Sequence, residues 1–142
     1  MSPSKRRKAR KCVVQALYQW QLSGNAITDV QTQFIEDNNL NKVDIDYFNE
    51  LLSGVAHNKS TIDEQLTGVI DRDITEMDPV ELNVLRMAVY ELQFRVDVPY
   101  KVVINEALEQ NKVFGSEEGH KFVNGVLDKL ACTLRQHEKK SH

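Results

Sequence analysis

The sequence predicts an all-α fold, a bundle of about six or seven helices, and three observations support it. Apolar residues recur at helical spacing along most of the chain. No run shows the alternation and hairpin signals typical of strands. Glycine, proline, serine and asparagine stand where such helices would begin or end. The 142 residues are enough for one domain with a buried core, and short connections favour a compact bundle.

The first expected helix begins at Ser4 and ends near Gly24, a residue suited to the position just after a helix. Its apolar stripe consists of Ala9, Cys12, Val13, Ala16, Leu17 and Trp20. A short second helix is expected to start with Thr28 as its N-cap and to end at Asn38 and Asn39.

A long third helix is expected from about Asp44, with Gly68 near its end. Its apolar stripe is Ile45, Phe48, Leu52, Val55, Ile62, Leu66 and Val69. The acidic segment 71–78 that follows has the composition of a loop. It is the natural seam between the first three helices and the last three.

Asp78, Pro79 and Glu81 mark the start of a fourth helix as N-cap, first-turn proline and capping-box acid. The helix is apolar over a wide arc, formed by Leu82, Val84, Leu85, Met87, Ala88, Val89 and Leu92. We therefore expect it to be central and the most buried.

Asp97 and Pro99 separate the fourth helix from a fifth, which is expected to stop at Gly115. Ser116 is the expected N-cap of the sixth helix, whose apolar stripe is Val123, Leu127, Leu130 and Leu134. The tail from Gln136 is polar and is expected to fray.

Composition excludes several classes of protein. The chain is 41% hydrophobic and 27% charged, as in soluble globular proteins, and no apolar run approaches the roughly 20 residues that span a bilayer. A secretory signal is not expected, because glutamines interrupt the segment after the basic N-terminus. Cys12 and Cys132 fall on apolar stripes and indicate no disulfide framework, so a cytoplasmic location is expected.

The basic residues are unevenly distributed. The chain has 18 Lys+Arg against 21 Asp+Glu, yet the first acidic residue is Asp29. Six cations precede it in one short run, Lys5, Arg6, Arg7, Lys8, Arg10 and Lys11. They oppose the helix macrodipole and have no acid four residues later, which favours a binding role with a polyanion over a merely solvated helix start.

Tyr18 lies on the same helical stripe as Arg7, Lys11 and Val14, which places an aromatic ring beside the cations. Such a ring can stack on an unpaired base, although a tyrosine at this position is equally compatible with packing at the core edge. Lys121 and Phe122 form a similar pair at the start of the sixth helix, where the alternative is that Phe122 flanks the core.

The sequence contains no recognisable catalytic or metal-binding motif. The four histidines form no zinc motif, the six glycines are scattered, and segment 71–78 lacks the EF-hand spacing. We therefore expect no enzyme activity, no cofactor and no metal site.

Several segments resemble the NusB family of bacterial transcription antitermination factors. The most specific is 120–129, which contains Phe122-Val123-Asn124-Gly125, and the others are 97–107, 6–20 and 85–92. The resemblance implies a single domain of two perpendicular three-helix subdomains that meet near 71–78. It also implies binding to boxA RNA of ribosomal RNA leaders jointly with the ribosomal protein NusE, with other Nus factors and RNA polymerase as indirect partners.

Carried onto this chain, the resemblance implies RNA contacts at Arg6, Arg7, Arg10, Tyr18, Lys121 and Phe122. The basic run itself adds Lys5 and Lys8. Glu81 would lie near the surface that faces NusE, with helix capping as its competing explanation. The accessible bases of single-stranded RNA make it the expected target.

Two other interpretations remain open. The chain could be a stand-alone accessory module for ribosomal RNA modification or processing, since similar domains precede some ribosomal RNA cytosine methyltransferases. We expect no segment after residue 142 that could hold a methyl donor, which weighs against an enzyme of that kind. The chain could also be a purely structural helical interaction module. An RNA-free form could hide its surface in a homodimer.

Overall fold

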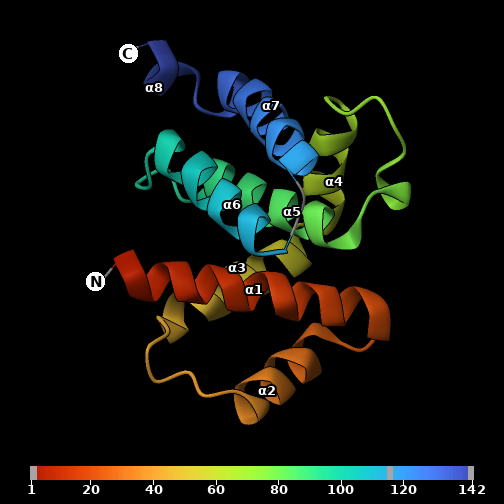
Figure 1. The fold of residues 1–142 in the computed structure, drawn as a ribbon, viewed down its shortest axis with the longest axis vertical. Coiled ribbons are helices and arrows are strands. Elements are labelled where there is room, and N and C mark those ends of the chain that lie inside the picture. Colours follow the sequence, from red (N-terminus) through yellow and green to blue (C-terminus); the bar gives the residue numbers. More distant parts are fainter. Residues whose placement is uncertain (1–2, 115–116, 141–142) are drawn as a thin grey trace.

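The computed structural model describes residues 3–114 and 117–140, and every regular element in these ranges is a helix (Figure 1). The elements are α1 (Pro3–Ser23), α2 (Ile27–Asp37), α3 (Ile45–His57), α4 (Lys59–Thr67), the 3-10 helix η1 (Ile74–Glu76), α5 (Pro79–Phe94), α6 (Tyr100–Phe114), α7 (Glu117–Leu134) and α8 (Gln136–Lys140). The predicted all-α class is therefore confirmed.

Helix α5 occupies the centre of the bundle. It packs against α6 and α7 on one side and against α1 and α3 on the other, while α2 packs on α1 and α3 (Figure 1). Residues 82–92 are buried without interruption. The expected apolar arc explains this burial, and the prediction that this helix is the most buried agrees with it.

Two side-chain caps and one glycine set three helix ends where the sequence indicates them. The carboxylate of Asp44 accepts a hydrogen bond from the backbone N–H of Tyr47 at 3.1 Å, and that of Asp78 accepts one from Val80 at 2.8 Å. Gly24 follows α1 with φ +71°, a conformation that favours glycine. These caps satisfy backbone groups that the helices leave free.

The expected start of the second helix was wrong. Helix α2 begins after Ala26, which provides no side-chain cap, and Thr28 lies inside the first turn. The carbonyl of Thr28 instead accepts a hydrogen bond from the hydroxyl of Thr32. An aspartate at position 29 within the first turn favours this helix end through the macrodipole.

The expected third helix is two helices, α3 and α4, which meet at Asn58. The backbone of Asn58 leaves the helical conformation (φ −109°, ψ 16°), and the side-chain amide of Asn58 donates to the carbonyl of Gly54 at 2.7 Å. An asparagine side chain that competes for a helix carbonyl stabilises such a break. Because the apolar stripe continues across the break, the sequence pattern predicted one continuous helix here.

The polar tail forms helix α8 instead of fraying over residues 136–140. The buried guanidinium of Arg135 donates to the carbonyls of Leu92 (2.7 Å), Glu91 (3.1 Å) and Arg95 (2.9 Å) at the end of α5. It also binds the carboxylate of Glu138 at 2.6 Å. Because the three carbonyls lie 40 to 44 residues away along the chain, the local sequence does not reveal them.

The predicted division into two subdomains near residues 71–78 stays a prediction; in the structure this segment joins α4 to α5 and contains η1. None of the described helices combines the length and apolar character needed to cross a bilayer.

Candidate nucleic-acid interface

The first half of α1 divides its basic residues between two sides. Lys5, Lys8 and Lys11 are exposed, whereas Arg10 is only 3% exposed and Arg6 is partly buried. Positions 6 and 10 are four residues apart, so they share the face that packs on α3 and α5. The basic run is therefore a row of surface lysines backed by inward-facing arginines.

Arg10 forms a buried ion pair with Glu91 of α5. Its Nε and Nη2 atoms donate to the two carboxylate oxygens at 2.9 and 2.8 Å, and Nη1 donates to Glu106 at 3.3 Å. Burial lowers the pKa of Arg10, but the hydrogen bonds and charge of Glu91 outweigh this and hold the pKa above its ordinary value. All three guanidinium nitrogens thus bind internal carboxylates.

Tyr47 lies at the centre of this buried polar network. Its hydroxyl donates to Glu91, and the guanidinium carbons of Arg6, Arg10 and Arg95 lie 4.3, 5.4 and 4.9 Å from its ring centroid. Burial and the charge of Glu91 raise the pKa of Tyr47, so its hydroxyl remains a donor at neutral pH. Cation–π contacts and the short hydrogen bond together fix α1 on α3 and α5.

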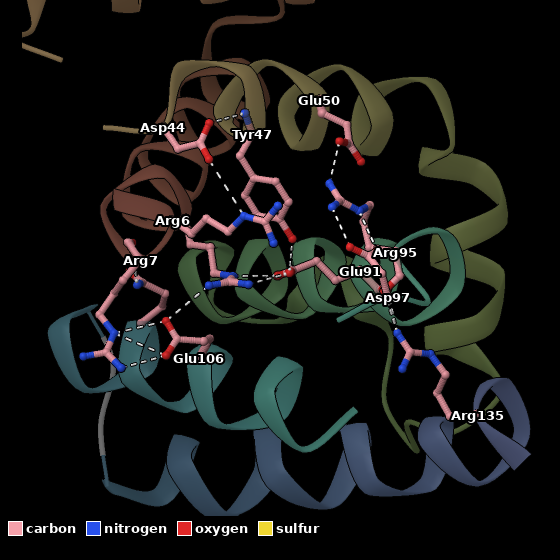
Figure 2. A network of polar contacts seen from close by, with 12 residues as sticks. Arg6, Arg7, Asp44, Tyr47, Glu50, Glu91, Arg95, Asp97, Glu106 and Arg135 are labelled. Carbon is pink, nitrogen blue, oxygen red and sulfur yellow. Dashed lines mark hydrogen bonds and ion pairs between the residues drawn. The ribbon is translucent and has the colours of Figure 1, made fainter. Parts of the chain in front are cut away.

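Arg7 lies at the rim of the network. Its side chain is 56% exposed, and it binds the carboxylate of Glu106 through Nη2 at 2.7 Å and Nε at 3.1 Å (Figure 2). These hydrogen bonds and the charge of Glu106 raise the pKa of Arg7. Arg6 faces Asp44 more loosely, at 3.8 Å.

The sequence argument considered only acids four residues later on the same helix, and the arginines of the basic run find their acidic partners on other elements. Acids four residues later are absent, but Glu91 and Glu106 follow 81 and 99 residues along the chain. The fold brings these carboxylates to α1, and no local pattern indicated the pairing. The surface lysines, in contrast, keep the exposure expected of them.

Tyr18 lies farther along α1 and is 37% exposed. It lines a pocket of about 430 Å³ together with the aromatic rings of Phe34 and Phe114 and the side chain of Val80. An apolar pocket beside an exposed ring can accept a nucleobase. The sequence analysis missed Phe114, although an aromatic residue at the end of the expected fifth helix, next to Gly115, was a possible signal.

Phe122 is half-buried at the start of α7, and Lys121 beside it is exposed. The guanidinium of Arg72 lies 4.4 Å from the centroid of the Phe122 ring. Arg72, Phe122 and Glu81 line a smaller pocket of about 150 Å³. The predicted stops and caps Gly115 and Ser116 lie outside the described residues.

Glu81 packs against the first turn of α7. A side-chain carbon at Gly119 would lie 2.3 Å from its carboxylate oxygen, so glycine at this position makes room for Glu81. Burial and the neighbouring charge of Asp78 raise the pKa of Glu81, while Arg72 lowers it.

The first turn of α5 joins the two pockets, because Val80 lines the pocket beside Tyr18 and its neighbour Glu81 lines the pocket beside Phe122. The fold thereby places Glu81 and Phe122, which the sequence analysis assigned to two different partners, in one pocket. Among the described residues, no group of three potential ligands is placed to hold a metal ion.

Comparisons with known proteins agree on one family. A model of the NusB family matches residues 7–132. The transcription antitermination protein NusB of Shewanella piezotolerans is 60% identical over 135 residues, 95% of this chain and 100% of that protein. The solved structure of T. maritima NusB has a TM-score of 0.79 and 32% identity, and the match covers 93% of this chain and 92% of that one. A crystal structure of antitermination factors NusB and NusE in complex with dsRNA has a TM-score of 0.82 and 27% identity, with 90% and 96% coverage.

Proposed function

Because the chain belongs to the NusB family, we propose that it is a transcription antitermination factor that binds boxA RNA of ribosomal RNA leaders together with NusE. The function rests on binding and needs no catalytic group. The resemblance and the relatives' names support the proposal at the level of the family, and the geometry of α1 supports it at the level of residues.

The observation that carries the proposal is the alignment of cations with an exposed ring on α1. Arg7, Lys11 and Tyr18 share one side of the helix, with Lys5 and Lys8 exposed beside them. Cations neutralise phosphates, and an exposed tyrosine beside an apolar pocket accepts a base. A strand of RNA that follows α1 would meet both kinds of contact in order.

Arg6 and Arg10 receive a different part in this proposal. Their guanidinium groups lie against Tyr47 and internal carboxylates, so we assign them the role of holding α1 in place. Direct RNA contact is then proposed for Lys5, Arg7, Lys8, Lys11, Tyr18, Lys121 and Phe122. Single-stranded RNA is the proposed target, because stacking needs bases that are not paired in a duplex.

Glu81 is the residue we propose for contact with NusE. Its carboxylate is partly buried, and burial and the neighbouring charge of Asp78 raise its pKa more than Arg72 lowers it. A cationic side chain of a partner would relieve this cost. Because Glu81 and Phe122 line one pocket, partner protein and RNA would meet at the start of α7.

The test is fluorescence anisotropy with labelled boxA RNA, a scrambled strand and a duplex, with and without NusE, at several salt concentrations. About three to four exposed cations on α1 predict a slope of log affinity against log salt of about −2 to −3, at about −0.7 for each phosphate of a single strand. Selective binding to boxA that NusE strengthens is the expected result. A slope near zero would contradict the assignment of α1.

A charge-matched pair of variants locates the contact. K8A/K11A removes two exposed cations from α1, whereas K42A/K129A removes two exposed cations elsewhere. We expect only the first to reduce the slope, by about 1.4 for two phosphate contacts. An equal reduction of the salt slope in both variants would mean that RNA binding depends on the net charge of the chain and not on contacts at α1.

The accessory-module alternative predicts a different pattern. Such a module would bind ribosomal RNA without any gain from NusE, and a purely structural module would bind neither RNA. The NusE-dependent comparison separates all three interpretations.

A further inference from the structure

We propose that Glu106 of α6 determines how selectively α1 binds RNA, by restraining and partly neutralising Arg7. The inference rests on the proposed RNA-binding function and adds a residue that does not itself contact RNA. In this arrangement the carboxylate lowers attraction to any polyanion, while it holds the guanidinium ready for a phosphate in one orientation.

The first step is the asymmetry of the pair. Glu106 is only 11% exposed in its side chain, whereas Arg7 is 56% exposed and reaches over it from the rim. Nε and Nη2 of Arg7 point inward to the carboxylate at 3.1 and 2.7 Å. A guanidinium carries five N–H groups, so the outer edge of Arg7 stays available to a phosphate while the inner edge is held.

The second step is that stability alone does not explain the contact. Arg10 already has a bidentate partner in Glu91, and its contact with Glu106 is a single longer one of 3.3 Å. The shorter bonds of Glu106 go to Arg7, which water would otherwise solvate. Because the Arg7 side chain is 56% exposed, solvent screens its attraction to Glu106 and reduces what the pair adds to the stability of the fold. The geometry therefore serves the orientation of Arg7 more than the fold.

The third step is the charge of the surface. Arg7 and Arg10 together are balanced by Glu91 and Glu106, so this part of α1 has little net charge. Lys5, Lys8 and Lys11 then supply most of the long-range attraction. Each additional net charge would strengthen binding to any strand about fivefold at 0.1 M salt, from a single-strand slope of about 0.7 per phosphate.

The experiment compares Glu106→Gln with wild type on boxA and scrambled RNA, with NusE present. Gln keeps the shape and one acceptor but removes the charge, and Glu91 still holds Arg10. We expect affinity for scrambled RNA to rise about fivefold and its salt slope to steepen by about 0.7. Affinity for boxA should change less than twofold, because the added charge is offset by the lost orientation. The ratio of the two affinities should therefore fall.

Glu109→Gln is the matched control. Glu109 lies on the same helix, 40% exposed, and its charge acts on Arg7, but it pairs with Lys112 and makes no hydrogen bond to Arg7. We expect it to change both RNAs alike. A double-mutant cycle with Arg7→Ala completes the test, because an effect transmitted through Arg7 should disappear in the Arg7→Ala background.

An unchanged affinity ratio in Glu106→Gln, or the same change in Glu109→Gln, would overturn the inference while leaving RNA binding intact. Loss of affinity for both RNAs to the same extent, with unchanged circular dichroism, would also overturn it. A wild-type protein that binds neither RNA would instead overturn the proposed function, and the inference with it.

Discussion

Arg10→Ala is expected to destabilise the fold strongly, so that weaker RNA binding by this variant would not by itself show a contact between Arg10 and RNA. Removing the guanidinium leaves Glu91, 1% exposed, with a single hydrogen-bond donor in the hydroxyl of Tyr47. Breaking a buried ion pair in this way costs about 3–5 kcal/mol, a large share of the roughly 5–15 kcal/mol that stabilises a domain. The melting temperature should fall by about 10–15 °C.

The measurement is urea unfolding followed by far-ultraviolet circular dichroism, with RNA affinity measured on the same samples. Lys8→Ala is the control on the same helix; since Lys8 is exposed, we expect it to change stability by less than about 0.5 kcal/mol. An Arg10→Ala variant as stable as wild type that nevertheless lost RNA binding would refute the reasoning. Such a result would mean that Arg10 contacts RNA directly and does not stabilise the fold through Glu91.

A compensated variant separates the two roles of Arg10. R10M/E91L replaces the ion pair by apolar side chains, an exchange that is often neutral or stabilising for a buried pair. Tyr47→Phe is added because its hydroxyl would lose its acceptor at a cost of about 1–3 kcal/mol. The triple variant should recover most of the stability and bind boxA RNA within about twofold of wild type. Recovered stability with lost affinity would assign Arg10 to the RNA contact.

Four further outcomes are expected. Tyr18→Ala should weaken RNA binding by about 1–3 kcal/mol, the value of one base–aromatic stack, and leave the urea midpoint nearly unchanged because the ring is 37% exposed. Arg135→Ala removes three hydrogen bonds to carbonyls at the end of α5 and should destabilise the chain by about 2–4 kcal/mol in the same unfolding assay. A loss of less than about 1 kcal/mol would mean that these bonds do not anchor α8. Because burial raises the pKa of Glu81, the folded chain binds the carboxyl proton more tightly than the unfolded chain. The free energy of unfolding should therefore fall as the pH rises from the ordinary pKa of a glutamate through the raised pKa of Glu81. Glu81→Gln should be more stable than wild type at pH 7 and lose this advantage below about pH 4, which unfolding measured across this pH range would detect. Gly119→Ala should keep the fold but displace the Glu81 carboxylate, so isothermal titration should show weaker NusE binding with unchanged RNA binding.

Helix positions were largely predictable because the signals are local. The apolar arc of α5 and the caps at Asp44 and Asp78 depend on residues within a turn or two of each other. The break at Asn58 was not predictable in this way, since the apolar stripe runs through it and the end of α3 is marked by the backbone angles of Asn58 and the bond from its side chain to Gly54. Helix α8 was missed for the opposite reason, because its anchor lies on α5.

For the candidate site, too, features that depend on neighbouring residues were predictable from the sequence, and contacts between distant residues were not. Exposure of the lysines on α1 followed from helical periodicity and charge, whereas for Tyr18 the sequence left exposure and packing at the core edge equally open. The inward pairing of Arg10 with Glu91, and the shared pocket of Glu81 and Phe122, needed the fold. The charge and spacing of residues in the sequence do not predict which basic side chain pairs with a buried carboxylate.

By itself, the sequence determined the all-α class, the central place of α5 and the concentration of positive charge on α1, because each follows from residues close together in the chain. Only the tertiary structure decided that the arginines of that run divide their contacts among Glu91, Glu106 and Asp44 while its lysines face solvent. The physical reason is that an ion pair depends on distance in space, and folding brings together groups that lie 81 and 99 residues apart in the chain.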